Sequence, residues 1–126
     1  MRQPIEASRK EIWTMKVMLL FMGTADESTA DPAAIAAAHE RIGAWWGQHA
    51  AAGTITGGEQ LAGPSSARKV DLTPDGPVVT DGPFAEASEV VGGYALLEVP
   101  SIEAAVALAG TWPGTGPVEV RPVIEM

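Results

Sequence analysis

The order of the apolar segments constrains the fold of this chain more than any other feature. A continuous apolar run at residues 17–22 has the length of a central strand. An alanine-rich stretch at residues 33–52 follows it, and Asp31 and Pro32 suit the N-cap and first position of a helix. The rest of the chain predicts a strand at 54–61, a hairpin from 68–72 and 78–80, a strand at 93–99, a helix capped by Ser101 and a strand at 118–124.

This β-α-β-hairpin-β-α-β order is the ferredoxin-like pattern. It predicts an α+β fold in which an antiparallel sheet carries two helices on one face. The other face of the sheet would stay uncovered, and an exposed apolar sheet face usually marks an interface. We therefore expect a homodimer.

Composition excludes several classes of protein. A chain of 126 residues is one domain, and its polar residues 1–14 predict a flexible extension ahead of a domain at 15–126. The net charge of −8 argues against nucleic acid as a partner, and no apolar run has the length of a membrane span. The absence of cysteine excludes disulfides and thiolate metal sites and is compatible with a cytoplasmic location. No nucleotide-binding or metal-binding motif is present, so we expect neither cofactor nor metal.

A carboxylate-rich turn stands at residues 79–89, with the sequence V-T-D-G-P-F-A-E-A-S-E. The Asp81 carboxylate can serve as a general base or anchor a polar substrate, or it can cap its own turn as an Asx residue. One helical turn at 86–90 would put Glu86 and Glu89 on the same side, where they can share a proton or ligate a hard cation. The alternative is a solvated pair at a helix end.

The predicted long helix has a stripe of residues at helical spacing, formed by Ile35, His39, Ile42, Trp46 and His49. His39 is a candidate acid–base group, although most helical histidines are surface residues. Because Trp45 and Trp46 are adjacent, they face different sides. We assign Trp46 to the core because it lies on the stripe, which leaves Trp45 for a pocket or an interface.

Two strands carry further candidates. Tyr94, Leu96 and Glu98 share one sheet face by period-2 alternation, and the Tyr94 hydroxyl can contact a ligand. Glu119 and Arg121 also share a face. They form either an exposed ion pair or a site in which Arg121 reaches the carboxylates of the turn or an anionic ligand. Glu59, which follows two glycines, can join the same cluster.

The turn, together with the G-G-Y at residues 92–94, resembles the DGPF branch of the YCII-related proteins. The resemblance runs from Met15 to the C-terminus and includes K-V-M-L-L at 16–20, G-G-E-Q-L at 57–61 and V-E-V-R-P at 118–122. It implies a dimeric α+β barrel, a fold that also occurs in cofactor-free monooxygenases, isomerases and cyclases. The motif residues that it marks are Glu59, Asp81, Glu86, Glu89, Glu119 and Arg121. Related YCII proteins are thought to use a His–Asp pair.

Two functions remain open on the sequence. The first is a small-molecule-binding homodimer with cofactor-free acid–base chemistry. Its catalytic candidates are Asp81, Glu86, Glu89 and His39, and its substrate-binding candidates are Glu59, Phe84, Tyr94, Arg121 and Trp45. The second is a regulatory or protein-interaction module, which the resemblance associates with alternative sigma factors. An enzyme needs a concave pocket where these residues converge, whereas an interaction module needs only an exposed patch.

Overall fold

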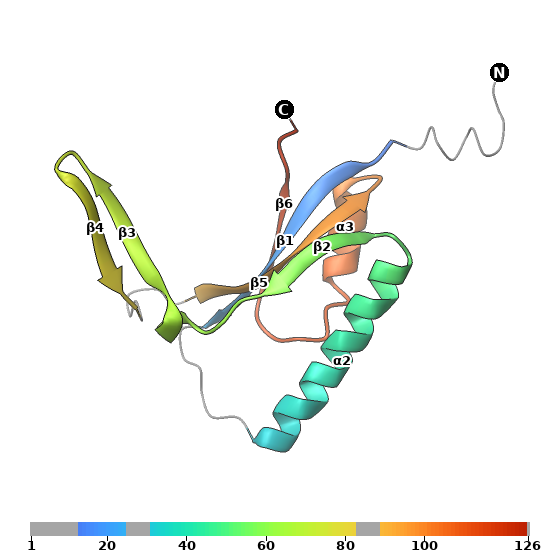
Figure 1. Ribbon diagram of the computed structural model, residues 1–126. Helices are drawn as coiled ribbons and strands as arrows, with labels where there is room; N and C mark the ends of the chain where they lie inside the picture. The colour runs from blue at the N-terminus through green and yellow to red at the C-terminus, as the bar shows by residue number, and fades with distance from the viewer. Residues whose placement is uncertain (1–12, 25–30, 83–88, 126) are drawn as a thin grey trace.

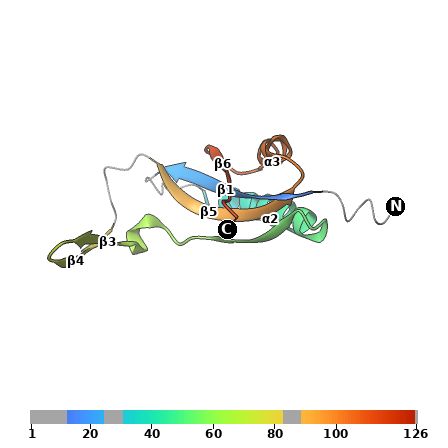
Figure 2. The ribbon, with the colours of Figure 1, turned by 90° about the horizontal axis from the view of Figure 1, so that it is seen from above.

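The computed structural model describes residues 13–24, 31–82 and 89–125. Four antiparallel strands form a sheet in the order β2-β5-β1-β6, and both helices lie on one of its faces (Figures 1 and 2). The elements of this body are β1 (Met15–Thr24), α2 (Pro32–Ala51), β2 (Ile55–Gln60), β5 (Glu89–Val99), α3 (Ile102–Ala109) and β6 (Val118–Pro122). The predicted ferredoxin-like α+β fold is thereby confirmed.

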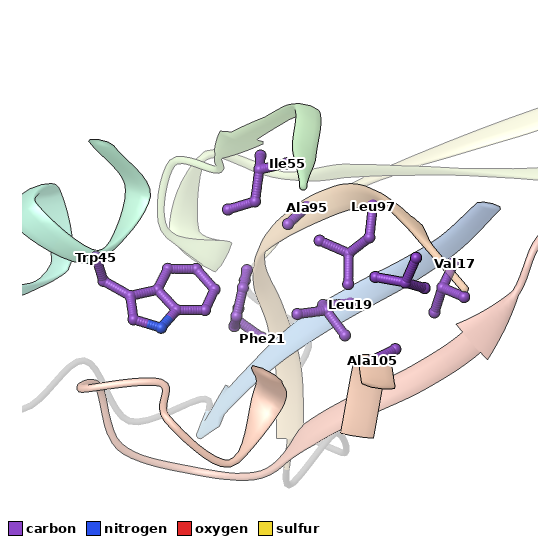
Figure 3. Close-up of a cluster of buried hydrophobic side chains, with 9 residues drawn as sticks. Val17, Leu19, Phe21, Trp45, Ile55, Ala95, Leu97 and Ala105 are labelled. Atoms are coloured by element: carbon purple, nitrogen blue, oxygen red, sulfur yellow. The ribbon is translucent and has the colours of Figure 1, made fainter. Parts of the chain in front are cut away.

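The core lies between the sheet and the helices (Figure 3). Alternate residues of β1 and β5 point into it because side chains of a strand alternate between faces. Its buried members are Val17, Leu19, Phe21, Trp45, Ile55, Ala95, Leu97, Val99 and Ala105. Burial of a valine or leucine side chain stabilises the fold by roughly 1.5–3 kcal/mol, so this layer holds the helices on the sheet.

The two helices begin in different ways. The Ser101 side chain accepts a hydrogen bond from the Ala104 backbone N–H at 3.1 Å, as predicted for the cap of α3. Asp31 precedes α2, but its side chain makes no capping hydrogen bond. Pro32 stands at the first helical position, where its fixed φ suits the first turn.

Several predicted boundaries need correction, and β1 and β4 are each longer at both ends than predicted. Strand β5 begins at Glu89 rather than at residue 93, so the helical turn expected at 86–90 is wrong for Glu89 and Val90. These residues pair with Thr24 and Gly23 of β1, and that ladder offers their backbone groups a better set of partners than one isolated turn. Strand β6 ends at Pro122, two residues before the predicted end.

A hairpin arm projects from the body (Figures 1 and 2). It consists of β3 (Arg68–Thr73) and β4 (Gly76–Asp81), which form a separate two-stranded sheet after the short 3-10 helix η1 (Pro64–Ser66). Gly76 has a φ of +116°, which favours glycine at the turn. The register places Val70, Leu72, Pro77 and Val79 on one face of the arm. That face is exposed, with Leu72 at 86%.

The second face of the four-stranded sheet carries its own apolar residues. Met18 and Leu20 of β1 lie opposite Leu96 and Tyr94 of β5, and antiparallel partners share a face. Both described helices lie on the other face of the sheet, and these four residues are half-buried. We call them the open sheet face.

Candidate functional site

A cavity of about 560 Å³ lies between α2 and one end of the sheet. Helix α2 forms one wall, the ends of β1, β2 and β5 form the floor, and the segment between α3 and β6 closes the side. The lining residues are Phe21, Met22, Gly23, His39, Ile42, Gly43, Trp46, Glu59, Gln60, Gly92, Gly93, Trp112, Gly114 and Thr115. The volume is in the range of small-molecule sites, which is roughly 300–1,000 Å³.

Three aromatic rings give the cavity rigid walls. Phe21 and Trp112 are stacked, with their ring centroids 4.0 Å apart and their planes at 27°. Trp46 meets Phe21 edge to face at 6.2 Å. Behind them Trp45 packs against Phe21 and Trp112, and its indole N–H donates to the Thr111 hydroxyl at 2.8 Å. This hydrogen bond ties α2 to the segment that carries Trp112.

The two adjacent tryptophans have the reverse of the predicted packing. Trp45 is 6% exposed and belongs to the buried core, while Trp46 is half-buried and lines the cavity. Figure 3 shows Trp45 reaching from α2 towards Phe21. The stripe that contains His39, Ile42 and Trp46 was correctly recognised as one face, but this face lines the cavity, with His39 itself exposed. The rotation of α2 about its axis turns Trp45 inwards instead.

Two glycines of the cavity lining lie so close to neighbouring atoms that a side chain would not fit. A Cβ atom on Gly93 would lie 2.9 Å from the Glu59 carbonyl oxygen, and one on Gly114 would lie 2.5 Å from the Trp112 indole nitrogen. Gly43 on α2 differs, because nothing lies within 4 Å of its Cβ position. A side chain at residue 43 would therefore enter free space at the cavity wall.

The register of β2 decides which polar side chain faces the cavity. The pairing shifts between Ile55 and Gly57, and after this bulge Glu59 lies opposite Tyr94 and Gln60 opposite Gly93. Gly93 in turn lies opposite Phe21 of the core, so Gln60 is on the helix-covered side of the sheet. Glu59 shares the open sheet face with Tyr94. This register assigns the Glu59 side chain to the face opposite the cavity, whereas Glu59 is also one of the lining residues.

The candidates predicted from the sequence are spread over three surfaces of the described chain. His39 and Glu59 are lining residues of the cavity. Asp81 is in the arm, where its carboxylate lies 3.3 Å from the Arg68 guanidinium and 78% of its side chain is exposed. Tyr94 lies on the open sheet face.

Arg121 also lies on the open sheet face, opposite Met18. The predicted pair with Glu119 is confirmed at 3.9 Å, and it is exposed. An exposed pair of this kind contributes about 0–1 kcal/mol. Arg121 thus pairs with Glu119 on its own strand, and Asp81 pairs with Arg68 across the hairpin. The predicted contact between Arg121 and Asp81 is not among the ion pairs of the described residues.

The remaining candidates cannot be placed fully. Phe84 and Glu86 lie outside the described residues. Glu89 is a strand residue that pairs with Thr24. Thr24 directly follows Gly23, which lines the cavity.

Several lining residues were missed from the sequence. Gln60 is one of them: period-2 alternation from Ile55 would place Glu59 on the inner side, and the bulge places Gln60 there instead. Trp112 gave no periodic signal because it lies in the segment after α3. The spacing of His39, Gly43 and Trp46, at i, i+4 and i+7, was a usable signal for a shared wall.

The described residues were also searched for a metal site and for a membrane-spanning helix. They contain no group of three or more His, Cys, Asp or Glu side chains placed to hold a metal ion. Nor does any helix in the described ranges combine the length and apolarity needed to cross a bilayer.

Comparison with protein families gives one match. Residues 15–126 match the model of the YCII-related domain, which covers all the described elements. No curated protein matches the chain.

Proposed function

This chain belongs to the YCII-related domain family, and we propose that it is a homodimer that binds a small molecule in the cavity beside α2. The carrying observation is the composition of the cavity wall. Phe21, Trp46 and Trp112 offer apolar surface, and His39 supplies an acid–base group at the same wall. Largely preformed concave sites with few polar groups are typical of small-molecule binding. We place this function in the cytoplasm, which the cysteine-free composition supports.

The enzymatic form of this proposal is proton transfer by His39 without a cofactor. Imidazole can both accept and donate a proton, and binding beside it would orient a substrate for that transfer. Among the described lining residues, only His39 and Glu59 carry an acidic or basic side chain, and the register of β2 assigns the Glu59 side chain to the opposite face. His39 is therefore the residue on which acid–base activity would depend.

Filling the cavity tests the proposal. Gly43→Leu places a side chain into the free space at the wall, and it should abolish ligand-induced increases in Tm in a thermal-shift screen of polar metabolites and aromatic compounds. The fold should tolerate it, because leucine has a higher helix propensity than glycine by up to about 1 kcal/mol.

Gly47→Leu is the matched control. Gly47 lies one turn further along α2, has the same open Cβ position and does not line the cavity. Ligands that stabilise the wild type and Gly47→Leu but not Gly43→Leu would support the proposal. A screen without any such ligand, or equal shifts in both variants, would contradict it.

The interaction module remains the second candidate, and the exposed arm is the observation that favours it. Val70, Leu72 and Val79 are each at least half-exposed on one face of a hairpin that projects from the body. An isolated two-stranded hairpin is marginally stable in water, so a partner on this face would stabilise it. The family resemblance suggests an alternative sigma factor as that partner.

Leu72→Lys separates the two functions. It should abolish co-sedimentation with a purified alternative sigma factor of the same organism if the arm binds one, and it should leave the small-molecule response unchanged. Wild-type protein that does not co-sediment would remove the support for this second function.

A further inference from the structure

We infer that the cavity takes a flat aromatic molecule with one polar end, whose ring system lies inside and whose polar end stays at the opening. This inference rests on the proposed function and adds the class of the ligand, without a preference for the sign of its charge. It follows from how burial divides the lining side chains and from the arrangement of the aromatic rings.

Burial divides the lining side chains of the cavity into two groups. The apolar ones are all buried or half-buried, and they are Phe21, Met22, Ile42, Trp46 and Trp112. The polar ones are all exposed, and they are His39, Glu59, Gln60 and Thr115. We call the first group the inner part and the second group the rim. The described lining therefore changes from apolar to polar between the floor of the cavity and its opening.

The inner part offers few partners to a polar group. Its side chains supply only the indole N–H donors of Trp46 and Trp112 and the weak sulfur acceptor of Met22. On the floor, Phe21 and Gly93 are paired in the ladder between β1 and β5. A hydroxyl or a charge placed here would lose its water without gaining an equivalent partner, which is unfavourable. The portion of a ligand that enters the inner part should therefore be apolar.

The rings of the inner part favour an aromatic ligand over a saturated one. Trp46 lies on α2 and Trp112 on the segment after α3, and each has its ring against Phe21. The hydrogen bond from Trp45 to Thr111 holds these two segments together. Aromatic rings gain from offset and edge-to-face contacts in addition to the burial of area. A saturated ring system of the same size would lose this gain.

The rim suits a single polar end of either charge or of none. His39, Gln60 and Thr115 come from three segments, and their side chains can both donate and accept hydrogen bonds. The described lining contains no Lys or Arg, and the register of β2 assigns the Glu59 carboxylate to the opposite face. A charge at this exposed rim keeps most of its water, so it needs no ionic partner there.

Isothermal titration with three uncharged two-ring probes tests the class of ligand. 2-Naphthylmethanol has a flat ring system with one polar end. Decahydro-2-naphthylmethanol, its saturated analogue, should bind about fivefold more weakly because it loses the ring contacts. 2,6-Bis(hydroxymethyl)naphthalene should bind about tenfold more weakly, since its second hydroxyl must enter the inner part. The Gly43→Leu variant should bind none of the three.

Two charged probes locate the polar end. 2-Naphthoate and 2-naphthylmethylammonium should bind wild type within about fivefold of each other, the equivalent of one contact between charges in water. Gln60→Glu places a carboxylate at the rim, so it should weaken 2-naphthoate and strengthen 2-naphthylmethylammonium, each by up to about fivefold. Gln48→Glu makes the same change in net charge on an exposed part of α2 that does not line the cavity, and it should alter neither affinity.

The results distinguish this inference from the proposed function. If the saturated or the doubly polar probe binds as tightly as 2-naphthylmethanol, and Gly43→Leu abolishes this binding, the ligand class is wrong and the cavity remains the binding site. Equal responses of the charged probes to Gln60→Glu and Gln48→Glu would contradict a polar end at the rim. A wild-type preference for one charge well above fivefold would show an ionic partner in the cavity and overturn the neutral rim. If no probe binds, the inference is also overturned, and the thermal-shift screen then decides on the proposed function independently.

Discussion

At the scale of single residues, the close approaches in β2 are the most restrictive feature of the structure. Gly58 has a φ of +142° and lies below the Trp46 ring, at a distance of 2.6 Å from its Cβ position to the Trp46 Cη2 atom. The same position would also meet the Tyr94 carbonyl oxygen. A side chain here would be excluded both by the backbone conformation and by its neighbours. Gly58 thus permits Trp46 to rest on the sheet and form the cavity wall.

Gly58→Ala should therefore lower the free energy of unfolding by roughly 1–3 kcal/mol through backbone strain and displacement of neighbours. The adjacent Gly57→Ala is the matched control. Its Cβ would lie 3.8 Å from Leu96 Cδ1, an ordinary contact. Urea denaturation measures both. If both variants lost a similar amount of unfolding free energy, the close approach at Gly58 would not explain the effect.

Trp45 and Trp46 make different contributions, although they are neighbours. Trp45→Phe should lower the free energy of unfolding by about 1–3 kcal/mol, because it removes part of a buried ring and leaves Thr111 without its indole donor. Trp46→Phe should cost less stability and instead weaken ligand binding. Denaturation curves and the thermal-shift response to ligands check both effects. A larger loss of stability for Trp46→Phe would contradict the placement of Trp45 in the core.

At the scale of elements, the same kind of sequence signal has two outcomes. Asp31 and Ser101 both stand at an N-cap position, yet only Ser101 makes the side-chain hydrogen bond. A capping side chain satisfies one of the backbone N–H groups that the first turn leaves without an intrahelical partner. The two helices therefore depend on their caps to different degrees.

Ser101→Ala should destabilise the protein by about 1 kcal/mol, while Asp31→Ala should cost clearly less. Thermal unfolding followed by circular dichroism compares the two variants. For a domain of this size about 1 kcal/mol corresponds to a shift in Tm of several degrees. An equal shift in both variants would show that Asp31 supports α2 by another route.

At the scale of the whole molecule, the sheet has one covered face and one open face. Met18, Leu20, Tyr94 and Leu96 form the centre of the open face, and Glu119 and Arg121 lie at its side. We propose that the same face of a second copy covers it, since a two-fold symmetric contact uses one self-complementary patch on both subunits. Tyr94 and Glu59 would then lie at the subunit interface.

Leu20→Glu places a charge at the centre of this face and should convert a dimer into a monomer, because an unpaired buried charge is strongly unfavourable. Sedimentation equilibrium should give twice the chain mass of 13.1 kDa for the wild type and one chain mass for the variant. Val106→Glu, on the exposed side of α3, should remain dimeric. A monomeric wild type would contradict the dimer proposal.

Local signals in the sequence predict the order of the elements and their approximate positions. The apolar run of β1, the alanine-rich α2 and the Ser101 cap are local signals, and local hydrogen bonding and periodicity are sufficient to read them. Strand β5 was predicted too short because residues 86–90 were assigned to a helical turn and Gly92 has a low strand propensity, and pairing with β1 overrides both.

Which side chains meet depends on how the elements pack in three dimensions. The rotation of α2 on the sheet selects Trp45 for the core and Trp46 for the cavity. One bulge between Ile55 and Gly57 exchanges the faces of Glu59 and Gln60, because side chains of a strand alternate and a slip of one residue reverses every later one. Both depend on how elements distant in sequence pack together, and no local pattern encodes that packing.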